Sequence, residues 1–275
     1  MKRYRKIFIL LFVGAAVIFI NNNVALPELK TTTDQDISAS SLKASASLIK
    51  NEVVIKFSPE LPEKLDLQSA LIKDLESNSY YLRMKTQQQW PMASLTKLLT
   101  SVIALEKITP SAKVDQLVKR MMIYSDNRAA EQLSEAYGRQ EFLTAMQEKT
   151  EQLGMKNTSI FDESGLSFLN QSTVEDLEKL VVYITKKHPK IFQFSRELEI
   201  VVNNNRRKNI NKFAGQSDFL GGKTGYTDEA HGNLITLFEF NGHPVMIIVL
   251  GTANRHERFN QTNILRKWIS KFYNS

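Results

Sequence analysis

The stretch from residue 232 to residue 250 constrains the fold more than any other part of the chain. Two apolar runs, 232–240 and 244–250, are joined there by Asn241-Gly242. An Asn-Gly pair readily takes the positive backbone angles of a tight two-residue turn, so this arrangement predicts an antiparallel β-hairpin. Residues 68–84 show a similar pattern around the polar turn 76–79. The sequence therefore predicts an antiparallel sheet built from segments that are far apart in the chain.

Between these two hairpins the apolar residues follow a helical spacing. The run 94–106 carries apolar residues around nearly its whole circumference, which predicts a helix that is largely buried. Further helices are predicted over 114–123, 128–138, 140–153 and 173–187, the last with a capping box beginning at Ser172, and over 256–273. Additional strands are predicted at 53–55, at 198–202 and around 219–227. The order of these elements, with strands before and after a helical insert of about 107–195, indicates an α+β fold with a helical lobe beside an antiparallel sheet.

Charge and composition exclude several kinds of function. The chain has no cysteine, which excludes disulfides and thiolate metal sites, and its four histidines show no metal-ligand spacing, so no metal or other cofactor is expected. The net charge is +7, and four of these charges lie within the first six residues. We expect no nucleic-acid partner, and we interpret the basic cluster 206–208 as a solvated loop.

The N-terminus has the pattern of an export signal. Basic residues from Lys2 to Lys6 precede an apolar run from Ile7 to Ile20, which is shorter than the ~20 residues of a comfortable membrane span. Residues 1–20 are therefore predicted to be a signal peptide or an uncleaved signal anchor that would tie the chain to the membrane. Residues 21–51 are rich in Asn, Thr, Ser and Ala and are predicted to be a flexible linker. The ordered domain is then 52–275.

Three short motifs follow one another in a fixed order. They are S-x-x-K at Ser94 and Lys97, S-D-N at 125–127, and K-T-G at 223–225. Each has an ordinary structural explanation, respectively a helix cap, a turn between helices, and an exposed strand edge. Lys97 is harder to explain in this way, because burying its charge on so apolar a helix is costly unless the amine is paired or neutral. A neutral lysine one helical turn from a serine can activate that serine as a nucleophile.

Beyond these motifs, which β-lactamases and penicillin-binding proteins share, the chain resembles the low-molecular-mass penicillin-binding proteins of the D-alanyl-D-alanine carboxypeptidase (peptidase S11) family. The resemblance covers about residues 66–275 and extends to the segments 128–131, 153–158, 163–167, 226–230 and 249–251. It implies a β-lactamase/transpeptidase-like fold, in which N- and C-terminal helices flank the sheet. It also implies an exported serine DD-peptidase that cleaves peptidoglycan stem peptides, at D-Ala-D-Ala or D-Ala-meso-diamino acid bonds, and that β-lactams inhibit. Its place would be the extracytoplasmic side of the membrane, the periplasm or the cell wall.

The resemblance also implies a role for each motif residue. Ser94 would form the acyl-enzyme, Lys97 would be its base, and Ser125 would relay a proton to the leaving amine. The substrate would be bound by Asn127, Lys223, Thr224, Gly225 and Tyr226, with an oxyanion hole from the backbone N–H groups of Ser94 and Tyr226.

The sequence differs from the family pattern in two respects, and it leaves two alternative functions open. The interval between Ser94 and Ser125 is shorter than in many relatives, and no C-terminal β-domain is expected after the peptidase domain. This compact form, together with Tyr226 after K-T-G, favours the endopeptidase branch over the carboxypeptidases. One rival is a class A-like β-lactamase, for which Glu163 is the candidate deacylating carboxylate. The other is a non-catalytic module that binds peptidoglycan or penicillin.

Overall fold

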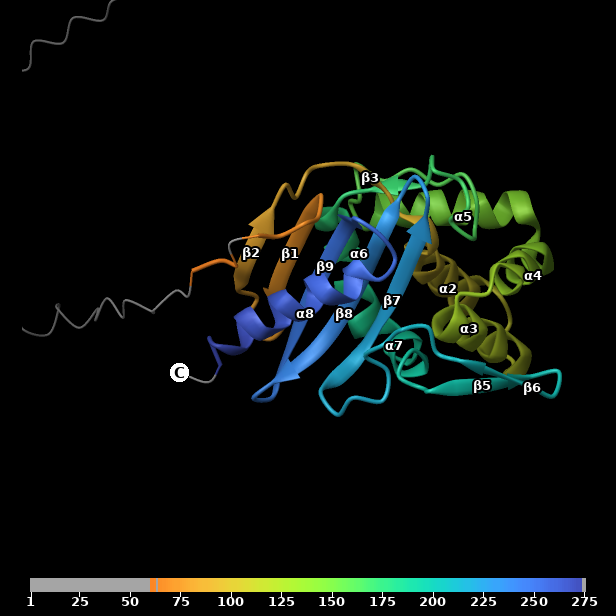
Figure 1. Ribbon diagram of the computed structural model, residues 1–275. Helices are drawn as coiled ribbons and strands as arrows, with labels where there is room; N and C mark the ends of the chain where they lie inside the picture. Colours follow the sequence, from red (N-terminus) through yellow and green to blue (C-terminus); the bar gives the residue numbers. More distant parts are fainter. Residues whose placement is uncertain (1–59, 63, 274–275) are drawn as a thin grey trace, which may run out of the picture. The chain divides into compact units, whose positions relative to one another are not determined.

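The computed structural model describes residues 60–62 and 64–273, and its centre is a five-stranded antiparallel sheet. The strand order is β2-β1-β9-β8-β7, so β7 is an edge strand (Figure 1). The strands are β1 (Ser69–Asp74), β2 (Tyr80–Met84), β7 (Phe219–Thr227), β8 (His231–Phe240) and β9 (His243–Thr252). Both predicted hairpins are confirmed. Asn241 and Gly242 have φ values of 48° and 85°, the left-handed geometry that the Asn-Gly turn requires.

Helices cover both faces of this sheet, which explains why the apolar runs of its central strands are continuous. In β9, Val245, Ile247 and Val249 pack on one face against α8 (Glu257–Ser270). The alternate residues, from Met246 to Leu250, pack on the other face against the helical part of the chain. Successive side chains of a strand point to opposite faces, so a strand covered on both sides reads as an unbroken apolar run. In Figure 1, α8 lies in front of the sheet and α6 behind it.

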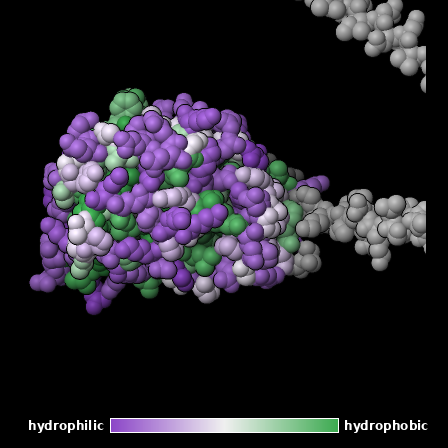
Figure 2. All heavy atoms as spheres, turned by 180° about the vertical axis from the view of Figure 1, so that it is seen from behind, coloured by the Kyte–Doolittle hydropathy of each residue, from purple (hydrophilic) through white to green (hydrophobic). Residues whose placement is uncertain are grey.

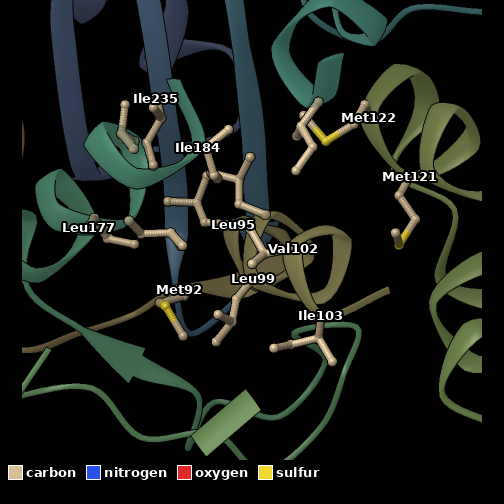
Figure 3. Close-up of a cluster of buried hydrophobic side chains, with 14 of the residues drawn as sticks. Met92, Leu95, Leu99, Val102, Ile103, Met121, Met122, Leu177, Ile184 and Ile235 are labelled. Atoms are coloured by element: carbon tan, nitrogen blue, oxygen red, sulfur yellow. The ribbon is translucent and has the colours of Figure 1, made fainter. Parts of the chain in front are cut away.

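The remaining helices lie between β2 and β7 in the sequence. They are α2 (Thr96–Lys107), α3 (Ala112–Tyr124), α4 (Asn127–Tyr137), α5 (Arg139–Gln152), α6 (Val174–Lys187) and the short α7 (Lys190–Phe194). A 3₁₀ turn, η1 (Ala93–Leu95), leads into α2. As predicted, α2 is buried from Thr96 to Ala104, and it packs against α3, α4, α5 and α6. Figure 3 shows this core, where Leu95, Leu99 and Val102 meet side chains from the surrounding helices and β8.

Some local predictions need correction. The side chain that caps α6 is Thr173, which accepts the backbone N–H of Asp176, and not Ser172. The basic cluster 206–208, expected to be a loop, belongs to strand β6 (Asn205–Lys208), which pairs with β5 (Glu199–Val202). Its side chains are exposed, as expected, so polarity hid its strand character. A separate two-stranded sheet pairs β3 (Trp90–Pro91) with β4 (Gln171–Ser172), two segments that are far apart in the sequence.

Several predictions fall outside the described residues. These are the N-terminal signal, the linker, the strand at 53–55, and any N-terminal helix beside the sheet. Among the described residues, no helix is long and apolar enough to cross a membrane. Figure 2 shows the rear of the molecule, where hydrophilic side chains dominate and apolar ones form small patches between them.

Candidate active site

The first motif places a serine hydroxyl in contact with a buried amine. Ser94 lies in η1, directly after Ala93, whose φ of 47° is in the left-handed region that a residue with a Cβ rarely adopts. Lys97 follows in the first turn of α2, on the same face. Its Nζ donates a hydrogen bond of 2.9 Å to Ser94 Oγ. This is the spacing at which an amine can accept the proton of an attacking hydroxyl.

The surroundings of Lys97 favour its neutral form. The side chain is completely buried, and its other hydrogen bond goes to the backbone carbonyl of Ser164. Burial lowers the pKa of Lys97 to about 7, although the carboxylates of Asp162 and Asp126, among others, act in the opposite direction. A large fraction of the amine is therefore unprotonated at neutral pH, as a general base requires.

The second and third motifs meet through another buried lysine. Ser125 ends α3 in the left-handed conformation, with φ of 62°, and its Oγ accepts a hydrogen bond of 2.9 Å from Lys223 Nζ of β7. Burial, together with the positive charges of Lys97 and Arg258, holds the pKa of Lys223 well below its ordinary value. The loop that carries Ser125 is fixed by Asp126, which caps α4 and accepts hydrogen bonds from Arg120 and Tyr124.

The K-T-G segment lies close to η1 because β7 is an edge strand and Gly225 has no side chain. A Cβ on Gly225 would come within 2.8 Å of the Met92 carbonyl oxygen, so glycine permits this approach. A cleft of about 450 Å³ lies here, and its walls include Ser94, Ser125, Thr224 and Tyr226. The structure thus brings residues of all three motifs together. Of the predicted site residues, Asn127 begins α4 beside this loop but is not among the residues found to line the cleft.

The cleft also contains a cation that the sequence reading missed. Arg258, in the first turn of α8, is 7% exposed and donates a hydrogen bond of 2.7 Å from Nη1 to the Gly225 carbonyl. Its Nε is buried without a hydrogen-bond partner among the described residues. Burial, and then the nearby Arg255, lowers the pKa of Arg258 to about 10, so it stays charged at neutral pH. Helical spacing was the sequence signal that could have revealed its burial, because Arg258 lies on the same face of α8 as Thr262 and Leu265, which are also buried.

Comparison with known proteins now identifies the family. The peptidase S11 model, described as D-alanyl-D-alanine carboxypeptidase, matches residues 107–254, which is more than half of the chain. The chain belongs to this family. No three His, Asp or Glu side chains in the described part of this S11 peptidase are grouped to hold a metal ion.

Curated relatives and solved structures agree with this assignment. The chain is 28% identical to a D-alanyl-D-alanine endopeptidase of Pseudomonas aeruginosa, over 76% of this chain and 79% of the relative. It is also 28% identical to the D-alanyl-D-alanine endopeptidase of Escherichia coli, over 73% and 76%. Penicillin-binding protein D2 of Listeria monocytogenes, in its ampicillin-bound form, superimposes with a TM-score of 0.68 and 25% identity, over 75% of this chain and 98% of that one. The predicted fold class is therefore confirmed.

Proposed function

We propose that this chain is a serine DD-peptidase that cleaves D-Ala-D-Ala or D-Ala-meso-diamino acid bonds in peptidoglycan stem peptides through an acyl-enzyme on Ser94. The observation that carries the proposal is the 2.9 Å hydrogen bond between Ser94 Oγ and Lys97 Nζ, with Lys97 completely buried and its pKa lowered to about 7. Such a pair is an activated nucleophile. Membership of the S11 family supports the reaction and the substrate class.

The acylation step follows from this geometry. Neutral Lys97 takes the Ser94 hydroxyl proton as Oγ attacks the peptide carbonyl carbon. The negative charge that develops on the carbonyl oxygen would be stabilised by the backbone N–H groups of Ser94 and Tyr226. The C–N bond then breaks, which leaves the acyl group on Ser94.

Ser125 and Lys223 would serve the leaving group. Because Ser125 Oγ accepts from Lys223 Nζ at 2.9 Å, its own proton is free to pass to the departing amine nitrogen. The proton that Lys97 took from Ser94 would be relayed to Ser125 in its place, which restores the Ser125 hydroxyl and the neutral Lys97. Water then attacks the acyl-enzyme, releases the shortened peptide and restores the Ser94 hydroxyl. Asn127 would hold the peptide chain of the substrate.

The terminal carboxylate of the substrate would be bound at the K-T-G end of the cleft. Gly225 allows β7 to approach η1, Thr224 would present a hydroxyl in the cleft, and Lys223 would present its amine beside it. Arg258 extends the cationic surface beyond the motif, and a carboxylate would give its unpartnered Nε an acceptor.

We further propose that the bond cleaved is a cross-link, which makes the enzyme an endopeptidase. Three D-alanyl-D-alanine endopeptidases are each 28% identical to this chain over 73–76% of it, whereas two carboxypeptidases are 28% identical over 58% of it and 22% identical over 75% of it. Purified cross-linked muropeptide dimers should be converted to monomers faster than free pentapeptides lose D-Ala. The reverse preference would assign carboxypeptidase activity to the same site.

Peptidoglycan and β-lactams would reach this site outside the cytoplasm. The basic and apolar N-terminal residues would export the chain, and an uncleaved segment would attach it to the membrane. Immunoblotting of cell fractions, with the N-terminal residue of the mature chain determined by mass spectrometry, tests both points. A full-length chain in the cytosolic fraction would contradict them.

The acyl-enzyme is tested by intact-mass measurement of the purified chain over time with benzylpenicillin. We expect the mass of one penicillin to be added to the parent protein and no addition to Ser94→Ala, which should remain folded. Penicillin that is hydrolysed without a lasting adduct would indicate a β-lactamase. Penicillin that remains intact, with no adduct, would indicate a non-catalytic binding module.

A further inference from the structure

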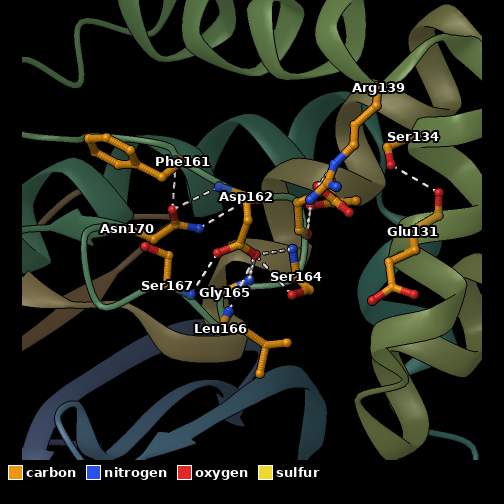
Figure 4. A network of polar contacts seen from close by, with 12 residues as sticks. Glu131, Ser134, Arg139, Phe161, Asp162, Ser164, Gly165, Leu166, Ser167 and Asn170 are labelled. Carbon is orange, nitrogen blue, oxygen red and sulfur yellow. Dashed lines mark hydrogen bonds and ion pairs between the residues drawn. The ribbon is translucent and has the colours of Figure 1, made fainter.

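The loop 161–167 is organised around one carboxylate that the catalytic motifs do not include. Asp162 Oδ1 accepts hydrogen bonds from the backbone N–H of Ser164 at 2.7 Å and from its hydroxyl at 2.8 Å. It also accepts from the N–H groups of Gly165 and Leu166, while Oδ2 accepts the N–H of Ser167 at 2.7 Å. Figure 4 shows the carboxylate at the centre of this turn. One side chain therefore determines the path of the loop.

This loop lies directly against the turn that carries the nucleophile. Gly165 has a φ of 81°, and a Cβ there would lie 1.9 Å from the Ala93 carbonyl oxygen, so the two backbones are in close contact. Buried Asn170 holds the start of the loop, since its Oδ1 accepts the N–H of Asp162 and its Nδ2 donates to Thr96 Oγ1 in the first turn of α2. The loop is thus fixed to the same backbone that positions Ser94 and Lys97.

One carbonyl of the loop contacts the catalytic amine. The backbone oxygen of Ser164 accepts a hydrogen bond from Lys97 Nζ, whose other partner is Ser94 Oγ. The direction of that carbonyl depends on the turn that Asp162 holds, because Asp162 binds both polar hydrogens of Ser164. An amine that also donates to a fixed carbonyl has a defined orientation, with its lone pair left for the serine proton.

We propose that Asp162 is a positioning residue, whose carboxylate shapes the loop so that the Ser164 carbonyl orients the Lys97 amine toward Ser94. This inference rests on the proposed function, because it concerns the base of that reaction. Asp162 does not touch the substrate in this account. It acts on the reaction through the Ser164 carbonyl and through its own charge.

The charge of Asp162 gives the proposal a distinctive signature. The charged groups that face Lys97 are Asp162 and Glu163 in the loop, Asp126 before α4, Glu131 within α4, and Lys223 on β7. Burial lowers the pKa of Lys97, and Asp162 is the carboxylate that opposes this lowering most strongly. Neutralising Asp162 should therefore lower the pKa of Lys97 further, and acylation should persist to a lower pH.

Three variants of the full chain separate geometry from charge. Asp162→Asn removes the charge and one acceptor of the loop. Asp162→Glu keeps the charge but displaces the acceptors. Glu163→Gln removes a charge from the same loop and leaves the loop N–H bonds intact, since the described partner of its carboxylate is the exposed Arg139. For each variant, the rate constant of acylation by benzylpenicillin is measured by intact mass from pH 5 to pH 9.

The proposal predicts a different result for each variant. In a plot of the acylation rate constant against pH, the acidic limb is the part where the rate constant rises toward its plateau. For Asp162→Asn, the plateau rate constant should fall by between about tenfold and a hundredfold, and the midpoint of the acidic limb should shift to lower pH by roughly one unit. For Asp162→Glu, the plateau should fall and the limb should stay where it is in the parent. For Glu163→Gln, the limb should move down by less and the plateau should stay within about twofold of the parent.

Two results would overturn the proposal. One is a folded Asp162→Asn protein whose acidic limb stays at the pH of the parent, whether or not its plateau is lowered. With the parent plateau Asp162 would have no role in the reaction, and with a lowered plateau its role would be merely structural. The other is Asp162→Glu with the plateau of the parent, which decides the matter even if Asp162→Asn does not fold. A parent protein that forms no adduct would instead contradict the proposed function, so the two failures are distinguishable.

Discussion

Buried cations occur in two regions of this molecule, and the two regions treat them in opposite ways. Around α6, Lys73 of β1 lies 2.6 Å from Glu178 of α6, and Lys149 of α5, which also contacts Tyr183 of α6, lies 2.7 Å from Glu106 of α2. Next to the Ser94 and Ser125 hydroxyls of the cleft, Lys97 and Lys223 contact hydroxyl and carbonyl oxygens. Among the described residues, neither of these two has a carboxylate within ion-pair distance. The difference lies in what surrounds the amine, because all four side chains are buried.

The pKa values follow this difference. Burial lowers the pKa of Lys73 and of Lys149, but the hydrogen bond and the charge of the paired glutamate more than offset it, so both pKa values are raised. For Lys97 and Lys223 burial prevails, and both pKa values are lowered. A buried lysine with a carboxylate partner is a structural cation, while Lys97, which has no carboxylate partner among the described residues, can take up and release a proton near neutral pH.

The largest effect should come from removing the amine of Lys97, which contacts the Ser94 hydroxyl and has no carboxylate partner among the described residues. Lys97→Met should lower the rate constant of acylation by benzylpenicillin by about 10³-fold, because the general base is lost. Its free energy of unfolding should not fall, since an apolar side chain of similar volume replaces an unpaired buried amine. Lys73→Met is the control and should still be acylated. A Lys97→Met protein with more than about a tenth of the parent rate would remove Lys97 as the base.

Breaking a buried pair should instead affect stability. Glu178→Gln leaves Lys73 buried without its counter-charge and should lower the free energy of unfolding by about 3 kcal/mol in urea titrations. Acylation of the folded protein should be unchanged. Glu175→Gln, on the same helix, removes the partly exposed pair with Arg83 and should cost less than about 1 kcal/mol. Equal losses in the two variants would show that burial does not distinguish the pairs.

Arg258 gives a smaller test of the same comparison, because it too is a buried cation with no carboxylate in ion-pair distance among the described residues. Arg258→Gln should lower the acylation rate constant by about tenfold, as expected when a carboxylate loses one charge-assisted hydrogen bond. Arg255→Gln removes an exposed charge from the same cleft and should have a smaller effect. A larger loss in Arg255→Gln would place the carboxylate site elsewhere.

Much of the fold was readable from the sequence because its signals are local. The Asn241-Gly242 turn, the apolar runs of β8 and β9 and the helical spacing of α2 each reflect a strong local preference. The errors occurred where tertiary contacts, and not local preference, determine the secondary structure of a segment. Strand β6 is a run of exposed polar residues that, among the described strands, pairs with β5 alone, and α7 is too short for periodicity to reveal it.

The same distinction applies to the site. Ser94, Lys97, Ser125 and Lys223 could be predicted as site residues because each belongs to a short motif whose residue types suggest the chemistry. Arg258 was missed because its importance comes from the carbonyl of Gly225, which is distant in sequence. Asp162 was overlooked for a related reason, since its influence on Lys97 passes through the carbonyl of Ser164 and becomes visible only when the loop is folded.

The most direct test of the central claim is the pH dependence of acylation in the parent protein. Lys97 acts as a base only when unprotonated, and its pKa is lowered to about 7, so activity is lost as the pH falls through that value. The rate constant for benzylpenicillin, measured from pH 5 to pH 10, should be low at pH 5, rise with a midpoint near 7 and then level off. A midpoint near the ordinary lysine value of about 10.4, or a rate constant that does not change between pH 5 and pH 9, would contradict the account.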